Sequence, residues 1–164
     1  MSHWEVVSSD MAFYLSQDRE ADVVGAYRRY QQYLHGNRSR FPLGAFELAT
    51  AEWWQDPQDH KCPHDSWLET ITISKTGDDY RSKLRHSRIS VRLVGAYHDG
   101  FIELQYPIVY RYSLTAVGSA GGLGDWLCDE FTLSSESHLV HEIEWERGRW
   151  IIEASDIAFR WIPG

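Results

Sequence analysis

The spacing of apolar residues predicts two helices in the N-terminal third of the chain. The segment SQDREADVVGAYRRYQQYLHGN, residues 16–37, holds one stripe at helical spacing: Val23, Tyr27, Tyr30 and Leu34. Ser16 or Asp18 is suited to cap the start of this helix. The segment PLGAFELATAEWW, residues 42–54, predicts a second and shorter helix.

From about residue 67 the period of the pattern falls to two, which is typical of β-strands. The longest alternating run, FIELQYPIVYRYSL at 101–114, places seven side chains on one face: Ile102, Leu104, Tyr106, Ile108, Tyr110, Tyr112 and Leu114. Pro107 has no N–H group to donate to a neighbouring strand, so we expect a bulge or an edge position there. His98-Asp99-Gly100, just before the run, predicts a tight hairpin turn.

The order of these elements predicts the fold class. Residues 1–56 are expected to be mainly helical and residues 67–162 to form strands, and no repeat or domain boundary interrupts the pattern. We therefore expect a single α+β domain over residues 1–164. Two N-terminal helices would pack on a five- to seven-stranded, mainly antiparallel sheet, which gives a domain of two layers.

Charge and composition narrow the classes of partner. The chain of 164 residues has a formal net charge of −8, with 24 acidic against 16 basic residues, which disfavours nucleic-acid binding. Only the basic run from Arg81 to Arg92 would suit a nucleic acid, whereas residues 125–156 hold nine acids against two arginines. Eight Trp and nine Tyr are enough both to fill a core and to populate a binding surface.

The start of the chain and its two cysteines predict a compartment. MSHWEVVSSDMAFYL has neither the basic region nor the apolar core of a secretory signal. No run approaches the roughly 20 apolar residues that span a bilayer. We therefore expect a cytoplasmic protein without a bound cofactor, in which Cys62 and Cys128 are reduced thiols.

The stretch DPQDHKCPHDSWLET, residues 56–70, places His60, Cys62 and His64 at every second position. Imidazole and thiolate are good zinc ligands, and three of them would leave a fourth position open for water. The spacing differs, however, from the gaps of structural zinc sites, and Pro63 interrupts an extended backbone. A polar loop is the favoured interpretation, a metal site of these three residues is the alternative, and a nucleophilic Cys62 is the weakest.

A buried acid–base pair is predicted between two strands of the C-terminal half. In HLVHEIEWE the alternation places His141 on the apolar face, and in WLCDEFTL it places Asp129 on the inward face. If these strands are neighbours, the two side chains form a hydrogen-bonded pair. Such a pair holds strand register in a core, and it is also the geometry of a catalytic base with its orienting carboxylate.

The opposite face of the same strand is acidic. Glu142, Glu144 and Glu146 alternate along it, and a basic partner would relieve their mutual repulsion. Glu130 lies at the margin of this face, and Trp126 is a candidate flanking aromatic residue. These five residues form the predicted partner-binding face, because charges steer association and aromatic anchors supply binding energy.

In size, acidity, tryptophan content and lack of a catalytic motif, the chain resembles the small single-domain immunity proteins with which bacteria neutralise toxins. This resemblance implies a non-enzymatic bacterial protein that sequesters a basic partner, such as a toxin domain. The alternative is a small enzyme or ligand carrier, because the order of elements also resembles the nuclear-transport-factor-2-like fold. A pocket between sheet and helices would then be lined by Asp129, His141, Tyr106, Tyr110 and Tyr112.

Overall fold

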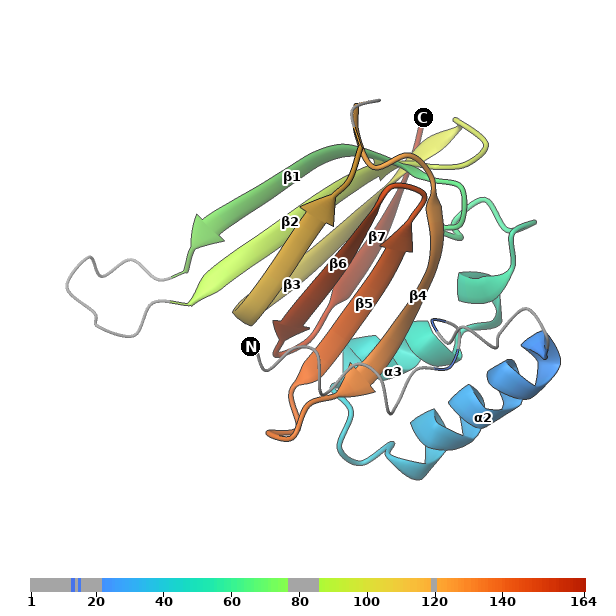
Figure 1. The fold of residues 1–164 in the computed structure, drawn as a ribbon, viewed down its shortest axis with the longest axis vertical. Helices are drawn as coiled ribbons and strands as arrows, with labels where there is room; N and C mark the ends of the chain where they lie inside the picture. The colour runs from blue at the N-terminus through green and yellow to red at the C-terminus, as the bar shows by residue number, and fades with distance from the viewer. Residues whose placement is uncertain (1–12, 14, 16–21, 77–85, 119–120) are drawn as a thin grey trace.

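Two α-helices are followed by seven antiparallel strands in the computed structural model, which describes residues 13, 15, 22–76, 86–118 and 121–164 (Figure 1). The helical elements are α2 (Val23–Gly36), α3 (Leu43–Thr50) and the short 3-10 helix η1 (Glu52–Gln55). The strands are β1 (Trp67–Lys75), β2 (Ser87–Val94), β3 (Gly100–Ala116), β4 (Trp126–Leu133), β5 (Leu139–Trp145), β6 (Gly148–Ala154) and β7 (Ala158–Pro163). The predicted α+β class is confirmed. No helix in the described part of the chain combines the length and the apolar character needed to cross a membrane.

The long strand β3 organises the sheet. Neighbouring strands follow the order β1-β2-β3-β6-β5-β4, and β7 pairs with β3 outside this order. Along one edge of β3, its first half (100–105) pairs with β7 and its second half (109–116) pairs with β6. β6 and β7 therefore behave as one strand that is interrupted at residues 155–157.

The interruption lies beside an irregular part of β3, where the sequence predicts a bulge at Pro107. The register with β2 shifts between Ser87 and Ile89, which pair with residues on either side of this proline. The register with β6 shifts between Val109 and Arg111. A proline and two nearby shifts bend the strand, because each unpaired residue breaks the regular ladder.

The irregularity also changes which side chains of β3 face inward. The first three residues of the predicted face are fully buried: Ile102, Leu104 and Tyr106. Beyond the bend Val109 is buried instead, while Tyr110 and Tyr112 are exposed. The prediction of one continuous face was therefore wrong in the second half of β3, since each register shift moves the alternation by one residue.

The cap of helix α2 lies four residues after Asp18 and six after Ser16, the two predicted caps, both of which lie outside the described part of the chain. Its cap is Asp22, whose Oδ1 accepts a hydrogen bond from the N–H of Gly25 at 2.8 Å. The buried stripe consists of Ala26, Tyr30 and Leu34. Two residues predicted to lie inside are exposed: Val23 and Tyr27.

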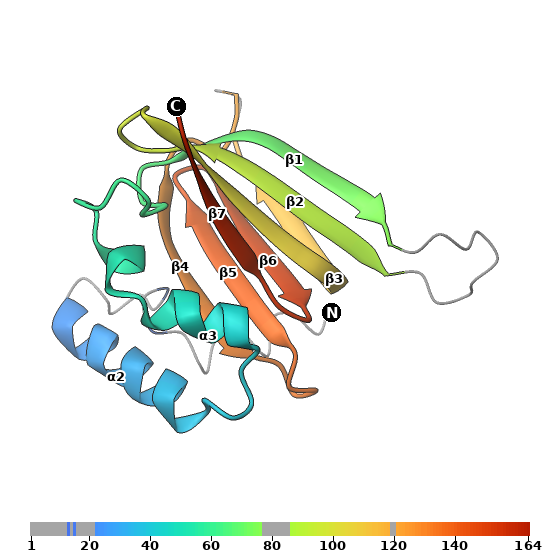
Figure 2. The ribbon, with the colours of Figure 1, turned by 180° about the vertical axis from the view of Figure 1, so that it is seen from behind.

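Helix α3 is held over the sheet by the interruption between β6 and β7. The residue at its N-terminus, Pro42, offers no capping side chain. The carboxylate of Asp156 takes this role, because it accepts hydrogen bonds from the N–H groups of Gly44 (3.2 Å) and Ala45 (3.0 Å). A Cβ on Gly44 would lie 2.2 Å from the carbonyl oxygen of Ile157, so only glycine permits this close approach. Figure 2 shows α3 in front of the sheet, with α2 on its outer side.

The sheet curls until its two outer strands meet at one end. An isolated bridge joins Trp67 at the start of β1 to Asp125 just before β4. Next to it, the N–H of Asp65 donates to the carbonyl of Trp126 (2.9 Å), and the N–H of Trp126 donates to the carbonyl of Ser66 (3.1 Å). The curl encloses a core rich in aromatic rings, including Trp54, Trp126, Phe131, Trp145 and Trp150.

Candidate functional site

The predicted pair of Asp129 and His141 is present in the core and belongs to a longer chain of hydrogen bonds. Nε2 of His141 lies 2.8 Å from Oδ2 of Asp129, and its Nδ1 lies 2.6 Å from the phenol oxygen of Tyr106. Oδ2 of Asp129 also accepts a hydrogen bond from Nε1 of Trp54 at 3.1 Å. These residues come from η1, β3, β4 and β5, so the network ties the helical layer to three strands.

The surroundings of Tyr106 decide where the protons of this network lie. Burial raises the pKa of Tyr106 well above its ordinary value, and the negative charge of Asp129 raises it further. The phenol therefore keeps its proton and is a donor available to Nδ1 of His141, 2.6 Å away. With Nδ1 as the acceptor, Nε2 of His141 carries a ring proton and is the donor to Asp129.

Aromatic rings enclose His141. Its ring stacks on Phe131 with centroids 4.1 Å apart, and the rings of Trp54 and Trp126 lie 6.5 and 5.9 Å away. A cavity of about 50 Å³ adjoins Asp129. One water occupies about 30 Å³ in the liquid, and pockets for small molecules span about 300–1,000 Å³. This cavity therefore has room for one or two waters and none for a ligand.

His60, Cys62 and His64 bond to three separate parts of the molecule. Their partners are the carboxylate of Asp99 for His60, the carbonyl of Trp54 for Cys62 (3.1 Å) and the carbonyl of Leu127 for His64 (2.8 Å). The structure therefore does not assemble these three residues into a metal site. They tie the loop to the β2–β3 turn, to η1 and to β4, which is the role expected of a polar loop.

Cys62 is expected to be unreactive in the folded protein. Its side chain is buried, and burial raises the pKa of the thiol to about 12. Because the thiolate is the reactive species, almost none is available at pH 8. In a Cys128→Ser variant, we expect Ellman's reagent to label the remaining thiol at least ~100-fold more slowly than after unfolding. Labelling of the native variant at the rate of the unfolded chain would contradict this expectation.

Three of the five residues predicted to bind a partner are buried: Trp126, Glu130 and Glu142. Oε2 of Glu142 lies 2.7 Å from Nη2 of Arg149 on the adjacent strand. Glu130 accepts a hydrogen bond from the backbone N–H of Leu15 at 2.8 Å. The prediction that these residues form an open acidic surface was therefore wrong. Alternation identifies the face of a strand, but it does not show what covers that face.

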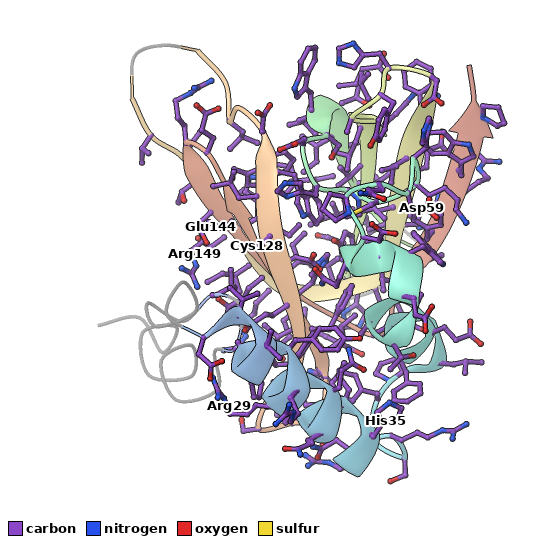
Figure 3. All side chains as sticks on the ribbon, turned by 90° about the vertical axis from the view of Figure 1, so that its right-hand side faces the viewer. Arg29, His35, Asp59, Cys128, Glu144 and Arg149 are labelled. Atoms are coloured by element: carbon purple, nitrogen blue, oxygen red, sulfur yellow. The ribbon has the colours of Figure 1, made fainter. Side chains whose placement is uncertain are left out.

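The other two residues, Glu144 and Glu146, lie toward the C-terminal end of β5. Figure 3 shows Glu144 with Cys128 and Arg149 on the side of the sheet away from α3. Glu144 is half-buried, and its Oε2 lies 3.4 Å from Sγ of Cys128. The side chain of Glu146 is 51% exposed. The exposed end of the predicted acidic face is therefore the β5–β6 turn.

A hollow of about 410 Å³ opens next to Glu146 where the two outer strands meet. Its walls are the start of β1 with Trp67, the loop 122–125, and the β5–β6 turn with Arg147. Trp67 is 47% exposed, and Nε1 of its indole donates a hydrogen bond to Oδ1 of Asp125 at 2.7 Å. One opening, the Trp67 hollow, thus combines an aromatic face with the carboxylates of Asp125 and Glu146.

A glycine brings the loop close to Glu146. Gly124 has a φ of +74°, and a Cβ there would lie 2.2 Å from Oε2 of Glu146. Oε1 of Glu146 lies 3.2 Å from Nη1 of Arg147, whose Nε donates to the carbonyl of Gly122 at 3.3 Å. The hollow therefore already holds one guanidinium group between a carboxylate and a backbone carbonyl.

Aromatic rings continue from the Trp67 hollow onto the β2–β3 turn. The ring of His98 meets Trp67 edge-on with centroids 4.5 Å apart. The exposed ring of Tyr97 stacks on His60 at 4.0 Å, with 5° between the ring planes. Aromatic and acidic side chains therefore share this end of the molecule.

Comparison with known proteins adds no family to these observations. No protein-family model, no curated protein and no solved structure matches the chain. The function therefore rests on the chemistry of two places, the buried network around His141 and the Trp67 hollow. Sequence reasoning found His141 by alternation but missed Trp67 and Asp125, because only the closure of the sheet brings them together.

Proposed function

We propose that the protein is a non-enzymatic binding module, of the immunity-protein type and cytoplasmic, that takes a basic protein partner such as a toxin domain at the Trp67 hollow. The observation that supports it is an exposed indole beside two carboxylates in a hollow of about 410 Å³. A cationic side chain of the partner can lie over the indole and bond to Asp125 or Glu146. Both contacts are favourable for Arg and Lys.

The charge of the chain suits a basic partner. The net charge of −8 attracts a cationic surface over distances longer than direct contacts, which raises the association rate at low salt. Of the five residues that the sequence predicts to bind a partner, the proposed site includes Glu146. Trp67 and Asp125 take the place of the predicted residues that are buried. The proposal therefore keeps the class of partner and moves the site to the end of the sheet.

The alternative function, a small enzyme or ligand carrier that uses His141 and Asp129, receives less support. His141 is fully buried, and the cavity beside Asp129 measures about 50 Å³. The phenol, imidazole, carboxylate and indole of the network satisfy one another. These are the properties of a group that holds a core together.

A titration with two matched peptides tests the proposed function. The first is a short arginine-rich peptide, and in the second every arginine is replaced by citrulline, its uncharged isostere. We expect the arginine peptide to shift the indole N–H resonance of Trp67 in ¹⁵N-labelled protein, with an affinity that falls as salt is added. Equal shifts with both peptides, or shifts that avoid Trp67, Asp125 and Glu146, would count against the proposal.

A further inference from the structure

We propose that Glu136, His138 and Glu153 form a binding site for a divalent transition-metal ion of the Zn²⁺ type. One ligand atom from each residue lies within 4.8 Å of the others, the one such group found among the described residues. Glu136 and His138 lie in the β4–β5 turn and Glu153 lies near the end of the neighbouring strand β6. The β4–β5 turn is at the opposite end of β5 from the β5–β6 turn (Figure 1), which borders the Trp67 hollow. It is independent of the proposed function.

The distances within the group fit one ion. Nδ1 of His138 lies 2.8 Å from Oε1 of Glu153 and 3.6 Å from Oε2 of Glu136. Zinc binds nitrogen and carboxylate oxygen at about 2.0–2.2 Å, so two ligands of a tetrahedral ion lie about 3.3–3.5 Å apart. The two observed distances bracket this value. To close around an ion, His138 and Glu153 move apart by roughly 0.5–0.7 Å, and Glu136 moves slightly toward His138.

The buried ligand is fixed by its surroundings. The side chain of Glu153 is 1% exposed, and its Oε2 accepts two hydrogen bonds from Arg111, from Nε at 2.7 Å and from Nη2 at 2.6 Å. Because Arg111 binds Oε2 through both nitrogens, the other oxygen, Oε1, is directed at His138. A ligating carboxylate in a metal site is commonly held by a second group in the same way, which orients it before the ion arrives.

The histidine ligand is fixed as well. The ring of His138 stacks on Tyr110 with centroids 3.9 Å apart and 15° between the planes. The stacking orients the ring, and its Nδ1 lies within 3.6 Å of both carboxylates. In the absence of an ion it is hydrogen-bonded to Glu153, and an ion replaces this hydrogen bond. The exposed pair of His60 and Asp99 differs, because it has one carboxylate and does not belong to such a group.

The set of ligands selects the kind of ion. An imidazole nitrogen favours Zn²⁺, Co²⁺ or Ni²⁺ over Mg²⁺ and Ca²⁺, which prefer oxygen ligands alone. Two carboxylates offset the charge of the ion, and the guanidinium of Arg111 compensates for one of them when the ion is absent. Three protein ligands leave a fourth position open to water.

Isothermal titration of the full, tag-free chain with ZnCl₂ at pH 7.5 tests the proposal. We expect one ion per chain and a binding constant that falls at least tenfold in Glu136→Gln and in His138→Ala. Glu136 is 71% exposed, so its substitution leaves the fold intact and keeps the test decisive if His138→Ala does not fold. The control is a His60→Ala/His64→Ala variant, which should bind Zn²⁺ as the wild type does.

A matching Co²⁺ titration reports on the ligands through visible absorption. Bands of a four- or five-coordinate ion are expected for the wild type and the control, and Glu136→Gln should need at least ~10-fold more Co²⁺ to develop them. The absence of Zn²⁺ binding at millimolar concentration would overturn the proposal. So would equal binding by the wild type and Glu136→Gln, or a loss of binding in the His60/His64 control.

Discussion

Replacing Asp129 with alanine is expected to lower the free energy of unfolding by about 3 to 5 kcal/mol. The substitution removes the acceptor shared by Nε2 of His141 and Nε1 of Trp54, so two buried N–H groups lose their partner. It also leaves a space in a closely packed core, which adds to the loss. Denaturation in guanidinium chloride, followed by tryptophan fluorescence, measures the change.

Two further variants control this measurement. Asp129→Asn keeps one acceptor oxygen in place, so the expected loss is smaller than with alanine. Glu47→Ala removes an exposed acid from α3 and should change the free energy of unfolding by no more than about 0.5 kcal/mol. If Asp129→Ala were as stable as the wild type, the network would not hold the core. The enzymatic alternative would then regain support, because the carboxylate would be present for chemistry.

Replacing Trp67 with alanine is expected to weaken binding of the arginine peptide or of a basic protein partner by at least ~30-fold, which corresponds to about 2 kcal/mol. The indole is half exposed and supplies the aromatic face of the Trp67 hollow, so its removal takes away the surface on which a cation lies. Titration calorimetry of variant and wild type measures the loss. Circular dichroism verifies that the fold is unchanged.

A matched aromatic control distinguishes binding at the Trp67 hollow from nonspecific binding to exposed aromatic residues. Tyr112 is similarly exposed, at 44%, but it lies on β3 and does not line the hollow, so Tyr112→Ala should bind as the wild type does. Glu146→Gln should slow association several-fold at low salt and little at high salt, because an exposed carboxylate acts mainly by steering. Equal losses in Trp67→Ala and Tyr112→Ala would contradict the proposed site.

Local pattern predicts the parts of this molecule that depend on neighbours in sequence. Alternation places His141 and Asp129 on the inward faces of their strands, and the structure has both there. Alternation failed in β3, because a bulge shifts the pattern by one residue and leaves no clear mark apart from Pro107. It also could not show that Glu142 is paired with Arg149 across β5 and β6.

The sequence could not predict the positions of residues that are set by contacts between segments far apart along the chain. Trp54 belongs to a segment predicted as helix, but α3 ends at Thr50 and the turn of η1 directs the indole to Asp129. Trp67 meets Asp125 only because the sheet curls through six strands before its edges touch. A pattern of apolar and polar residues fixes the face of each strand, but not the curvature of the whole sheet.

The interrupted strand formed by β6 and β7 has a consequence for synthesis of the chain. A nascent chain that has emerged only as far as β6 can pair it with the second half of β3, but the first half still lacks β7 along that edge. Unpaired edges of this kind are templates for aggregation. Until β7 has left the ribosome, the sheet remains incomplete, and a chaperone that shields strand edges would have its greatest effect in that interval.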